Sequence, residues 1–216
     1  MEQANFDYIL ASEGRAFCPE CEFLKSRCLC DTLKNVANKI HLIVLQHPSE
    51  SKHPLNTVRI MKKSFREMTV MTGEDFTSDL KLNTILCNTD NECALLYPGS
   101  DSKVLDKNYE RHKLTHLILI DGTWRKAKKI FMLSKNLQTL PSLKLAPTEH
   151  SDYRIRKSPN ESALSTLEAT VEALHFLEPE LNTASATTSF QKMIDLQIKK
   201  MGREVYQTNY LDKKKE

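Results

Sequence analysis

The sequence predicts an α/β fold in which helices cover both faces of a mostly parallel sheet. Short apolar runs, typical of buried strands, alternate along the 216 residues with segments in which apolar side chains recur at helical spacing. Alternation of this kind is typical of strand–helix–strand units, which form parallel sheets covered on both faces. The chain is 40% hydrophobic and 27% charged, a balance typical of a globular domain with a buried core.

The strands are predicted from apolar runs bounded by polar residues or turn signals. The run at 39–45 (KIHLIVL) is rich in leucine and β-branched residues, and the run at 117–120 (LILI) is wholly apolar. Both patterns indicate strands that are buried on two faces. Further candidates are 68–71, 84–86, 93–97 and 143–146.

Four helices are predicted from apolar residues that fall three and four positions apart. The first covers 57–65 and is expected to be capped by Thr57. Basic and apolar residues alternate over 124–133 as in an amphipathic helix. Two apolar stripes near the end of the chain predict the others, one from 164 to about 179 and one over 190–205.

Composition limits the classes of function. The formal net charge of +3 is too small by itself to indicate a nucleic-acid partner, although clustered cations would be compatible with one. No apolar run approaches the about 20 residues that span a bilayer, and 1–15 lacks the apolar core of a secretory signal. We therefore expect a cytoplasmic protein without a membrane partner, whose six cysteines are metal ligands or buried thiols rather than disulfides.

A compact cysteine segment lies near the N-terminus. Its spacing, CxxC-x6-CxC, suits one tetrahedral zinc site with a structural role, and the ligands are Cys18, Cys21, Cys28 and Cys30. The alternatives are a redox CxxC pair, which leaves the second pair unexplained, or unrelated thiols. Arg15, Lys25 and Arg27 beside the cluster either contact phosphate or are solvated. Cys87 and Cys93 are expected to be buried thiols.

Three segments that follow predicted strands are candidates for a ligand site, because open parallel sheets bind ligands at the carboxyl ends of their strands. They are 95–99 (LLYPG), 119–124 (LIDGTW) and 151–159 (SDYRIRKSP). The Pro-Gly turn lets a ligand approach the backbone, and Asp121 can act as a base or orient a cationic ligand. Trp124 can stack on a nucleobase, and the cations of the third segment suit phosphate or carboxylate.

Each of these features also has a purely structural interpretation. Pro-Gly is common in turns, Asp121 or Thr123 can cap the following helix, Trp124 can anchor the core, and a run of cations can simply be solvated. The sequence contains no Walker A, GxGxxG, GxSxG or HExxH motif. Nucleoside triphosphate hydrolysis, a conventional Rossmann site and these two hydrolase chemistries are therefore unsupported.

In combination these motifs resemble the DTW-domain family, whose signature is present as Asp121-Gly122-Thr123-Trp124. The resemblance covers nearly the whole chain. Besides the four cysteines it includes HPxE at 47–50, PLNT at 54–57, LYPG at 96–99, YRIRK at 153–157 and STLEA at 165–169. The order and spacing of these motifs make the match specific.

The family is similar to SPOUT-class RNA enzymes, which implies a trefoil-knotted α/β sheet that binds S-adenosylmethionine. The resemblance also implies a tRNA-uridine aminocarboxypropyltransferase, which attaches the 3-amino-3-carboxypropyl group to uridine N3 and releases methylthioadenosine. The implied organisation is an N-terminal segment with a zinc knuckle at 1–31, a catalytic domain at 32–210 and a basic tail at 211–216. The expected partners are S-adenosylmethionine and tRNA, with Zn²⁺ as a structural cofactor.

Particular residues receive roles from this resemblance. The catalytic residues are expected to be Asp121, Thr123 and Trp124. Donor binding is expected from Leu96, Tyr97, Pro98, Gly99, Asp121, Gly122, Leu145, Tyr153, Arg154 and Arg156. RNA binding is expected from Asn56, Thr57, Arg125 and Lys157. The alternatives are a SPOUT methyltransferase that uses the same donor and a non-catalytic zinc-containing RNA-binding protein.

Overall fold

The structure, a computed structural model, contains one central sheet of six parallel strands in the order β2-β1-β5-β3-β6-β4. It describes residues 16–109, 113–146, 155 and 164–211. The strands are β1 His41–Gln46, β2 Met68–Thr72, β3 Cys93–Leu96, β4 Lys103–Leu105, β5 His116–Asp121 and β6 Ser142–Leu145. The predicted parallel α/β sheet is thereby confirmed.

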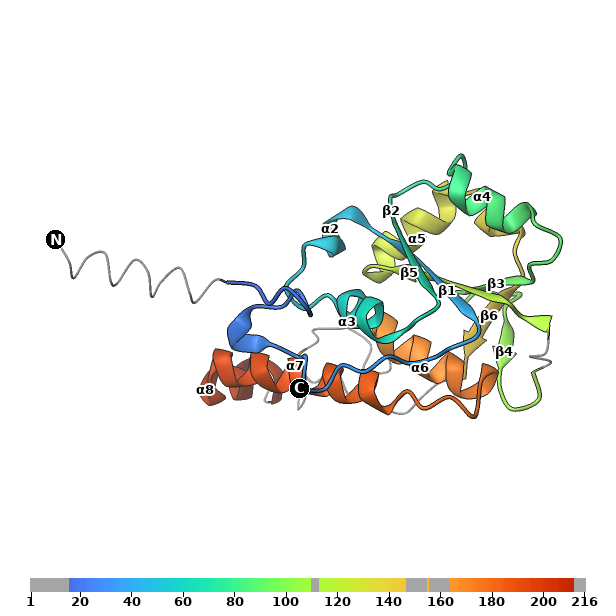
Figure 1. The fold of residues 1–216 in the computed structure, drawn as a ribbon. Coiled ribbons are helices and arrows are strands. Elements are labelled where there is room, and N and C mark those ends of the chain that lie inside the picture. The colour runs from blue at the N-terminus through green and yellow to red at the C-terminus, as the bar shows by residue number, and fades with distance from the viewer. Residues whose placement is uncertain (1–15, 110–112, 147–154, 156–163, 212–216) are drawn as a thin grey trace.

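Helices cover both faces of the sheet (Figure 1). They are α2 Pro48–Ser51, α3 Thr57–Ser64, α4 Leu80–Cys87, α5 Trp124–Leu133, α6 Thr166–Leu177, α7 Ala184–Met201 and α8 Arg203–Tyr206. In the view of Figure 1, α4 and α5 lie above the sheet, whereas α3, α6 and α7 lie below it.

The core is divided by the sheet because successive side chains of a strand point to opposite faces. In β1, Leu42 and Val44 pack into the cluster that also holds buried residues of α3, α6 and α7. Ile43 and Leu45 instead pack into a smaller cluster with residues of α4 and α5. All four side chains are fully buried, which explains why the run is apolar without alternation.

The cysteine segment shares the larger core. Cys21, Phe23 and Leu29 are buried in the same cluster as the residues of α3 and α7. A salt bridge from Lys192 to Asp31 also joins this segment to α7. The segment is therefore packed onto the main domain rather than tethered to it.

Several sequence-based predictions are corrected by the structure. Residues 84–86, predicted as a strand, lie in α4, which begins after the Asp79 cap and buries Leu82. The cap of α3 is Asn56 rather than Thr57, because the Asn56 side chain accepts the N–H of Val58. Short apolar runs do not distinguish a strand from a helix by periodicity alone.

Two further differences are a break in the last predicted helix and a strand that was not predicted. The last predicted helix is interrupted at Gly202, which has a φ of 86° and separates α7 from α8. This left-handed conformation is one that glycine adopts at little cost. Strand β4 was not predicted, since it has three residues and two of them are exposed.

Strand order around β6 bears on the predicted knot. β6 pairs with β3 on one side and β4 on the other, although β3 and β4 are consecutive in the chain. Their connection therefore passes across the end of β6. The chain leaves β6 through 147–163, which apart from Ile155 lies outside the described residues, and the knot stays a prediction.

None of the helices among the described residues is both long enough and apolar enough to cross a membrane.

Candidate functional site at the carboxyl edge of the sheet

The carboxyl ends of β1, β5, β3 and β6 form one edge of the sheet, and two of the three predicted segments meet there. Register places Gln46 beside Asp121 and Leu96 beside both Leu119 and Leu143. The 96–99 and 121–124 segments, together with Leu145 at the end of β6, are thus brought to the same edge. Tyr153, Arg154, Arg156 and Lys157 lie outside the described residues.

Asp121 is the most constrained polar residue of this edge. Its side chain is 8% exposed. Oδ2 accepts a hydrogen bond of 2.8 Å from Gln46 Nε2, and Oδ1 accepts one of 2.6 Å from Thr166 Oγ1. These bonds join β5 to β1 and to the first residue of α6. They fix the direction of the carboxylate, which is what a positioned base or binding group requires.

The start of α5 is capped by Thr123 and not by Asp121. Thr123 Oγ1 accepts the backbone N–H of Lys126 at 3.5 Å. The capping role that could have explained Asp121 is therefore filled by its neighbour. Gly122 leaves little room for a side chain, because a Cβ there would lie 3.0 Å from the Cβ of Lys126, which would have to shift by a few tenths of an ångström.

Trp124 stands at the first position of α5 with 53% of its surface exposed. A tryptophan that anchors a core is buried, so the interpretation of Trp124 as a core anchor is wrong. An exposed indole beside the end of β5 is available to stack on a planar ligand.

The loop after β1 is held against the site by Asn56. This buried side chain caps α3, donates to the carbonyl of Glu50 at 3.0 Å, and accepts a 3.4 Å bond from Gln46 Nε2. Thr57 is buried too, whereas Arg125 is exposed. RNA contact by Asn56, Thr57 and Arg125 stays a prediction, and the described contacts of Asn56 are internal.

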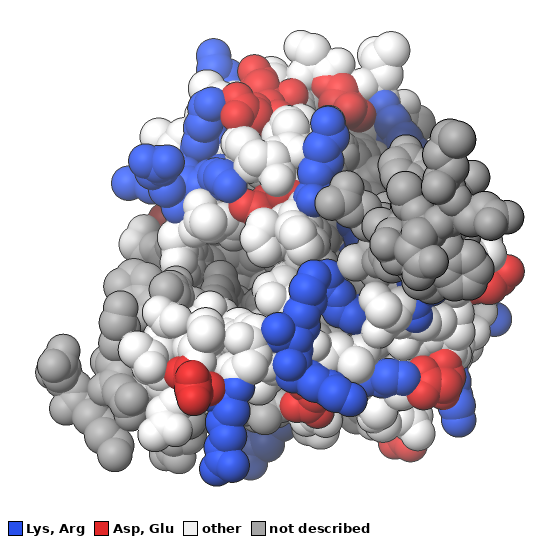
Figure 2. All heavy atoms as spheres, turned by 90° about the vertical axis from the view of Figure 1, so that its left-hand side faces the viewer, with Lys and Arg blue, Asp and Glu red and all other residues white. Residues whose placement is uncertain are grey.

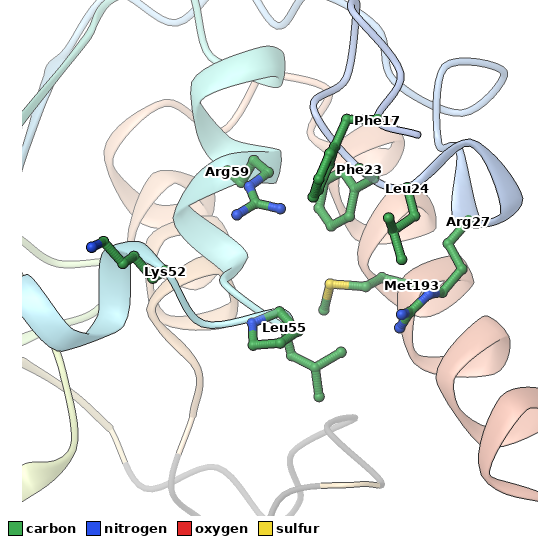
Figure 3. Close-up of a pocket in the computed structure, with 9 residues that line it drawn as sticks. Phe17, Phe23, Leu24, Arg27, Lys52, Leu55, Arg59 and Met193 are labelled. Atoms are coloured by element: carbon green, nitrogen blue, oxygen red, sulfur yellow. The ribbon is translucent and has the colours of Figure 1, made fainter. Parts of the chain in front are cut away.

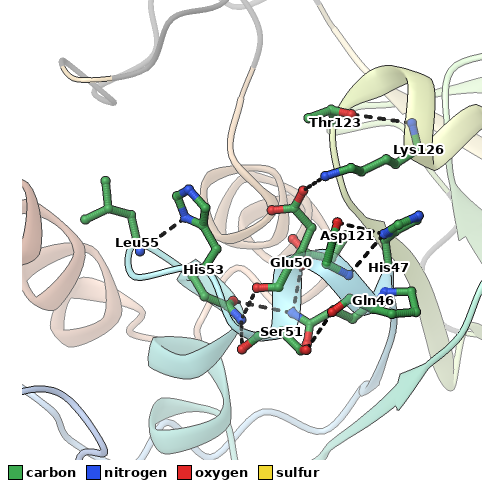
Figure 4. A network of polar contacts seen from close by, with 12 residues as sticks. Gln46, His47, Glu50, Ser51, His53, Leu55, Asp121, Thr123 and Lys126 are labelled. Carbon is green, nitrogen blue, oxygen red and sulfur yellow. Dashed lines mark hydrogen bonds and ion pairs between the residues drawn. The ribbon is translucent and has the colours of Figure 1, made fainter.

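Two ion-pair groups connect the same loop to α5, as seen in part in Figure 4. Glu50 Oε1 lies 2.6 Å from Lys126 Nζ. Glu74, which follows β2, accepts from Lys129 at 2.6 Å and from His47 Nε2 at 2.7 Å. Lys129, and to a lesser degree His47, lowers the pKa of Glu74. Lys126, Lys129 and Glu74 were not singled out from the sequence, because the pairs form only when strands β1, β2 and β5 align.

The 96–99 turn is held in place by hydrogen bonds between its main chain and the Ser102 side chain. Ser102 Oγ donates to the carbonyl of Tyr97 at 2.8 Å and accepts the N–H of Gly99 at 2.7 Å. The Tyr97 ring stacks on Phe131 of α5 with centroids 4.6 Å apart, and burial raises its pKa. Pro98 and Gly99 are exposed. The bonds to Ser102 fix the shape of the turn, and ligand contact by it stays a prediction.

The first turn of α6 lies against the same edge of the sheet and is stabilised by a capping box. Ser165 Oγ accepts the N–H of Glu168 at 3.2 Å, and Glu168 Oε2 accepts the N–H of Ser165 at 2.7 Å. These reciprocal bonds fix the first turn of α6. Thr166 is thereby held where its hydroxyl reaches Asp121.

The four predicted cysteines form a cluster that could hold a metal ion. Their Sγ atoms all lie within 4.8 Å of one another. The Cys18–Cys30 and Cys21–Cys28 pairs are 3.5 Å and 3.7 Å apart. A tetrahedron with metal–sulfur bonds of about 2.3 Å has edges of about 3.8 Å, so the donor set fits such an ion.

The thiols of the cluster differ in acidity. Backbone N–H groups of Cys21 and Glu20 lower the pKa of Cys18 to about 6. Hydrogen bonds in which the Cys30 thiol donates to Cys28 and Cys18 raise the pKa of Cys30 to about 12. Outside the cluster, Cys93 is half-buried and burial raises its pKa, but Cys87 is exposed, which contradicts the prediction that it is buried.

Fold and contacts together define a class: a parallel α/β protein with a cluster of polar side chains at the carboxyl edge of its sheet and a tetracysteine segment packed onto its core. The DTW domain model matches residues 15–198, and the chain therefore belongs to the DTW domain family. No solved structure matches the chain.

Relatives from two animals and a plant are all named tRNA-uridine aminocarboxypropyltransferases. The chain is 34% identical to tRNA-uridine aminocarboxypropyltransferase 2 of Drosophila melanogaster, over 76% of this chain and 68% of the relative. It is 30% identical to the protein of that name from Mus musculus, over 87% and 67%. It is 25% identical to tRNA-uridine aminocarboxypropyltransferase A of Arabidopsis thaliana, over 79% and 75%.

Proposed function

We propose that this chain is a tRNA-uridine aminocarboxypropyltransferase that moves the 3-amino-3-carboxypropyl group of S-adenosylmethionine to N3 of a tRNA uridine. The observation that carries the proposal is the shared name of relatives from an insect, a mammal and a plant. The family match at 15–198 includes both the cysteine cluster and the Asp121 edge.

The reaction is a displacement at carbon. Uridine N3 attacks the methylene carbon bonded to the sulfonium, the carbon–sulfur bond breaks, and its electron pair leaves on methylthioadenosine. N3 loses its proton in the process. The chain must therefore hold the methylene carbon, rather than the methyl group, in line with N3 and assist the loss of that proton.

Asp121 is the proposed base or orienting group. Gln46 and Thr166 hold its two oxygens, so its carboxylate cannot rotate freely while substrates bind. Thr123 and Gly122 support it by starting α5 directly after β5. The turn at 96–99 and Leu145 are proposed to contact the donor, together with Tyr153, Arg154 and Arg156.

Trp124 is proposed to hold the target base. N3 lies on the Watson–Crick edge, which is accessible only when the uridine is unpaired or flipped out of a helix. An indole that is 53% exposed at the end of β5 can stack on such a base. Arg125 and Lys157 are proposed to contact tRNA.

Zinc is the proposed occupant of the cysteine cluster, because four thiolates are a typical set for a structural zinc site. Cys18, Cys21, Cys28 and Cys30 would hold the ion and thereby fix the segment against α7. We also propose that the chain after β6 completes a trefoil knot, which the position of β6 between β3 and β4 supports.

Donor labelling separates this proposal from its alternatives. With S-adenosylmethionine labelled in the carboxyl group, an aminocarboxypropyltransferase labels tRNA and releases methylthioadenosine. With the methyl group labelled, a methyltransferase labels tRNA and releases S-adenosylhomocysteine. A non-catalytic RNA-binding protein labels tRNA in neither case. Methyl labelling, or no labelling of any tRNA in a complete cellular pool, would reject the proposal.

A further inference from the structure

A groove of about 220 Å³ lies between the cysteine segment, the loop before α3, α3 itself and α7 (Figure 3). Phe17, Phe23, Leu24, Leu55 and Met193 supply its apolar lining. Its volume is below the about 300–1,000 Å³ of pockets that enclose a whole small molecule. The groove can therefore take one flat group but not a large ligand.

Among the described residues that line the groove there are three cations, Arg27, Lys52 and Arg59, and no acidic residue. None of them forms an ion pair with a carboxylate of the described residues. Glu22, the acid nearest in sequence to Phe23, is already paired with Lys63 at 2.8 Å. An anion at the rim would thus meet positive charge that is not neutralised by these ion pairs.

The cations are placed by the structure rather than spread along a surface. Arg27 Nη1 donates to Gln197 of α7 at 2.7 Å, which holds its side chain across the groove. The Arg59 guanidinium lies 5.1 Å from the centroid of the Phe23 ring and donates to the carbonyl of Glu22 at 3.3 Å. In Figure 3, Arg59 lies near the Phe23 ring, while Arg27 and Lys52 lie on opposite sides of the apolar lining, with the Lys52 amino group directed away from it.

Phe17 adds an exposed aromatic ring to this arrangement. It is 62% exposed, more than Trp124 at 53%. Single exposed apolar residues are common, but an exposed ring beside several cations is a combination that suits single-stranded nucleic acid. On the side of the molecule that Figure 2 shows, Lys and Arg side chains also lie around a hollow.

The groove is connected to the proposed active site through one loop. Leu55 lines the groove, and the next residue, Asn56, accepts a hydrogen bond from Gln46. Gln46 in turn donates to Asp121. An RNA held in the groove would therefore lie next to the loop that borders the carboxyl edge.

We propose that this groove binds one unpaired nucleotide of the tRNA, distinct from the target uridine, with its base against Phe17 and the apolar lining and the phosphates on either side of it at Arg27, Arg59 and Lys52. This inference rests on the proposed function, because it takes tRNA as the partner. It adds a second contact that helps to select the substrate without touching the reacting atoms.

The test compares two groove variants with two matched controls in the full-length chain. Phe17→Ala and Lys52→Gln alter exposed groove residues. Leu80→Ala and Lys81→Gln make the same kinds of change at exposed positions of α4, on the other face of the sheet. Fluorescence anisotropy with an unmodified tRNA transcript over a salt series measures affinity, and calorimetry measures binding of S-adenosylmethionine.

Phe17→Ala is expected to weaken tRNA binding by about 5- to 150-fold, the effect of losing one stacked base. Lys52→Gln is expected to reduce the slope of log affinity against log salt by about 0.7, as for one contact to a single-stranded phosphate. Donor affinity and metal content stay as in the wild type. The two controls leave tRNA affinity and its salt slope unchanged.

Wild-type tRNA affinity and salt slope in both groove variants would overturn the inference and leave the groove to a protein partner. A loss of donor affinity in Phe17→Ala would also overturn it, since the groove would then belong to the donor pocket. Failure of the proposed function is a different result: the wild type labels no tRNA with the carboxyl-labelled donor. The binding experiment can still succeed in that case, so the two failures are distinguishable.

Discussion

Replacing Asp121 by asparagine separates a chemical role from a structural one. The carboxylate accepts hydrogen bonds from Gln46 and Thr166. A hydrogen bond to a charged group contributes about 1.5–3 kcal/mol and one between neutral groups about 0.5–1.5 kcal/mol. Asparagine can accept from Gln46 through its one oxygen, and its amide nitrogen must donate to the Thr166 hydroxyl, so each bond becomes neutral and loses about 1 kcal/mol. The free energy of unfolding should fall by about 2 kcal/mol, which lowers Tm by about 4–8 °C in a chain of this size.

The expected loss of activity is larger than the loss of stability. A positioned base contributes about 10²- to 10⁴-fold to the rate, which corresponds to about 3–5.5 kcal/mol in the barrier. The assay is single-turnover transfer to tRNA at saturating S-adenosylmethionine, with donor affinity measured by calorimetry. We expect the single-turnover rate of Asp121→Asn to fall within that range while the donor still binds.

Thr166→Val provides the matched control. It removes one of the two hydrogen bonds to Asp121 but keeps the carboxylate, so unfolding free energy falls by about 1.5–3 kcal/mol. The transfer rate of this variant should fall by less than about tenfold, because the base is still present. If both variants transfer at similar rates, the effect of Asp121 is structural and its assignment as the base is refuted.

The other predictions concern the cysteine cluster, Trp124 and two histidines. Elemental analysis is expected to find about one equivalent of zinc in the native protein and none in a variant with serine at all four cluster positions. A variant that retains the metal would reject the site. Trp124→Ala should change the free energy of unfolding by less than about 0.5 kcal/mol but lower the rate of transfer to tRNA. Trp124→Phe should retain most of the transfer rate, and an equal loss of rate in both variants would argue against stacking. Burial lowers the pKa of His41 and His116, so protonation of either histidine is less favourable in the folded state than in the unfolded state. The free energy of unfolding should therefore fall as pH drops below about 6.5. His41→Gln should make the urea midpoint depend less steeply on pH, and an unchanged dependence would contradict this prediction.

Strands and helices with a strong local signal were predictable from the sequence. The apolar runs at 39–45 and 117–120 correspond to β1 and β5, and the amphipathic segment 124–133 is α5. In these segments local pattern and tertiary burial favour the same structure. The strand predicted at 84–86 was wrong because a segment with two apolar residues, Ile85 and Leu86, fits either period. The Asp79 cap, which begins the helix, lies five residues before it.

The candidate site was predictable as a set of segments but not as a set of contacts. That Asp121 ends a strand could be read from the sequence, whereas its partners depend on which strands become neighbours. Gln46 reaches it only because β1 pairs with β5 in register, and Thr166 only because α6 returns to the same edge. A polar residue at the end of a buried strand, such as Gln46, was the available signal for the first partner.

The residues of the sequence motifs divide into two physical groups according to their contacts. Asn56 and Ser165 use their side chains to cap helices that border the edge, and Thr123 does the same for α5. Trp124 instead directs an exposed side chain outward from the same edge. Substitutions in the first group should therefore lower stability by about 0.5–2 kcal/mol each and reduce transfer through misplacement of Asp121. Substitution of an exposed residue such as Trp124 should reduce tRNA binding or transfer without a matching loss of stability. Measuring the transfer rate and the free energy of unfolding in each variant therefore assigns each of these residues to one group.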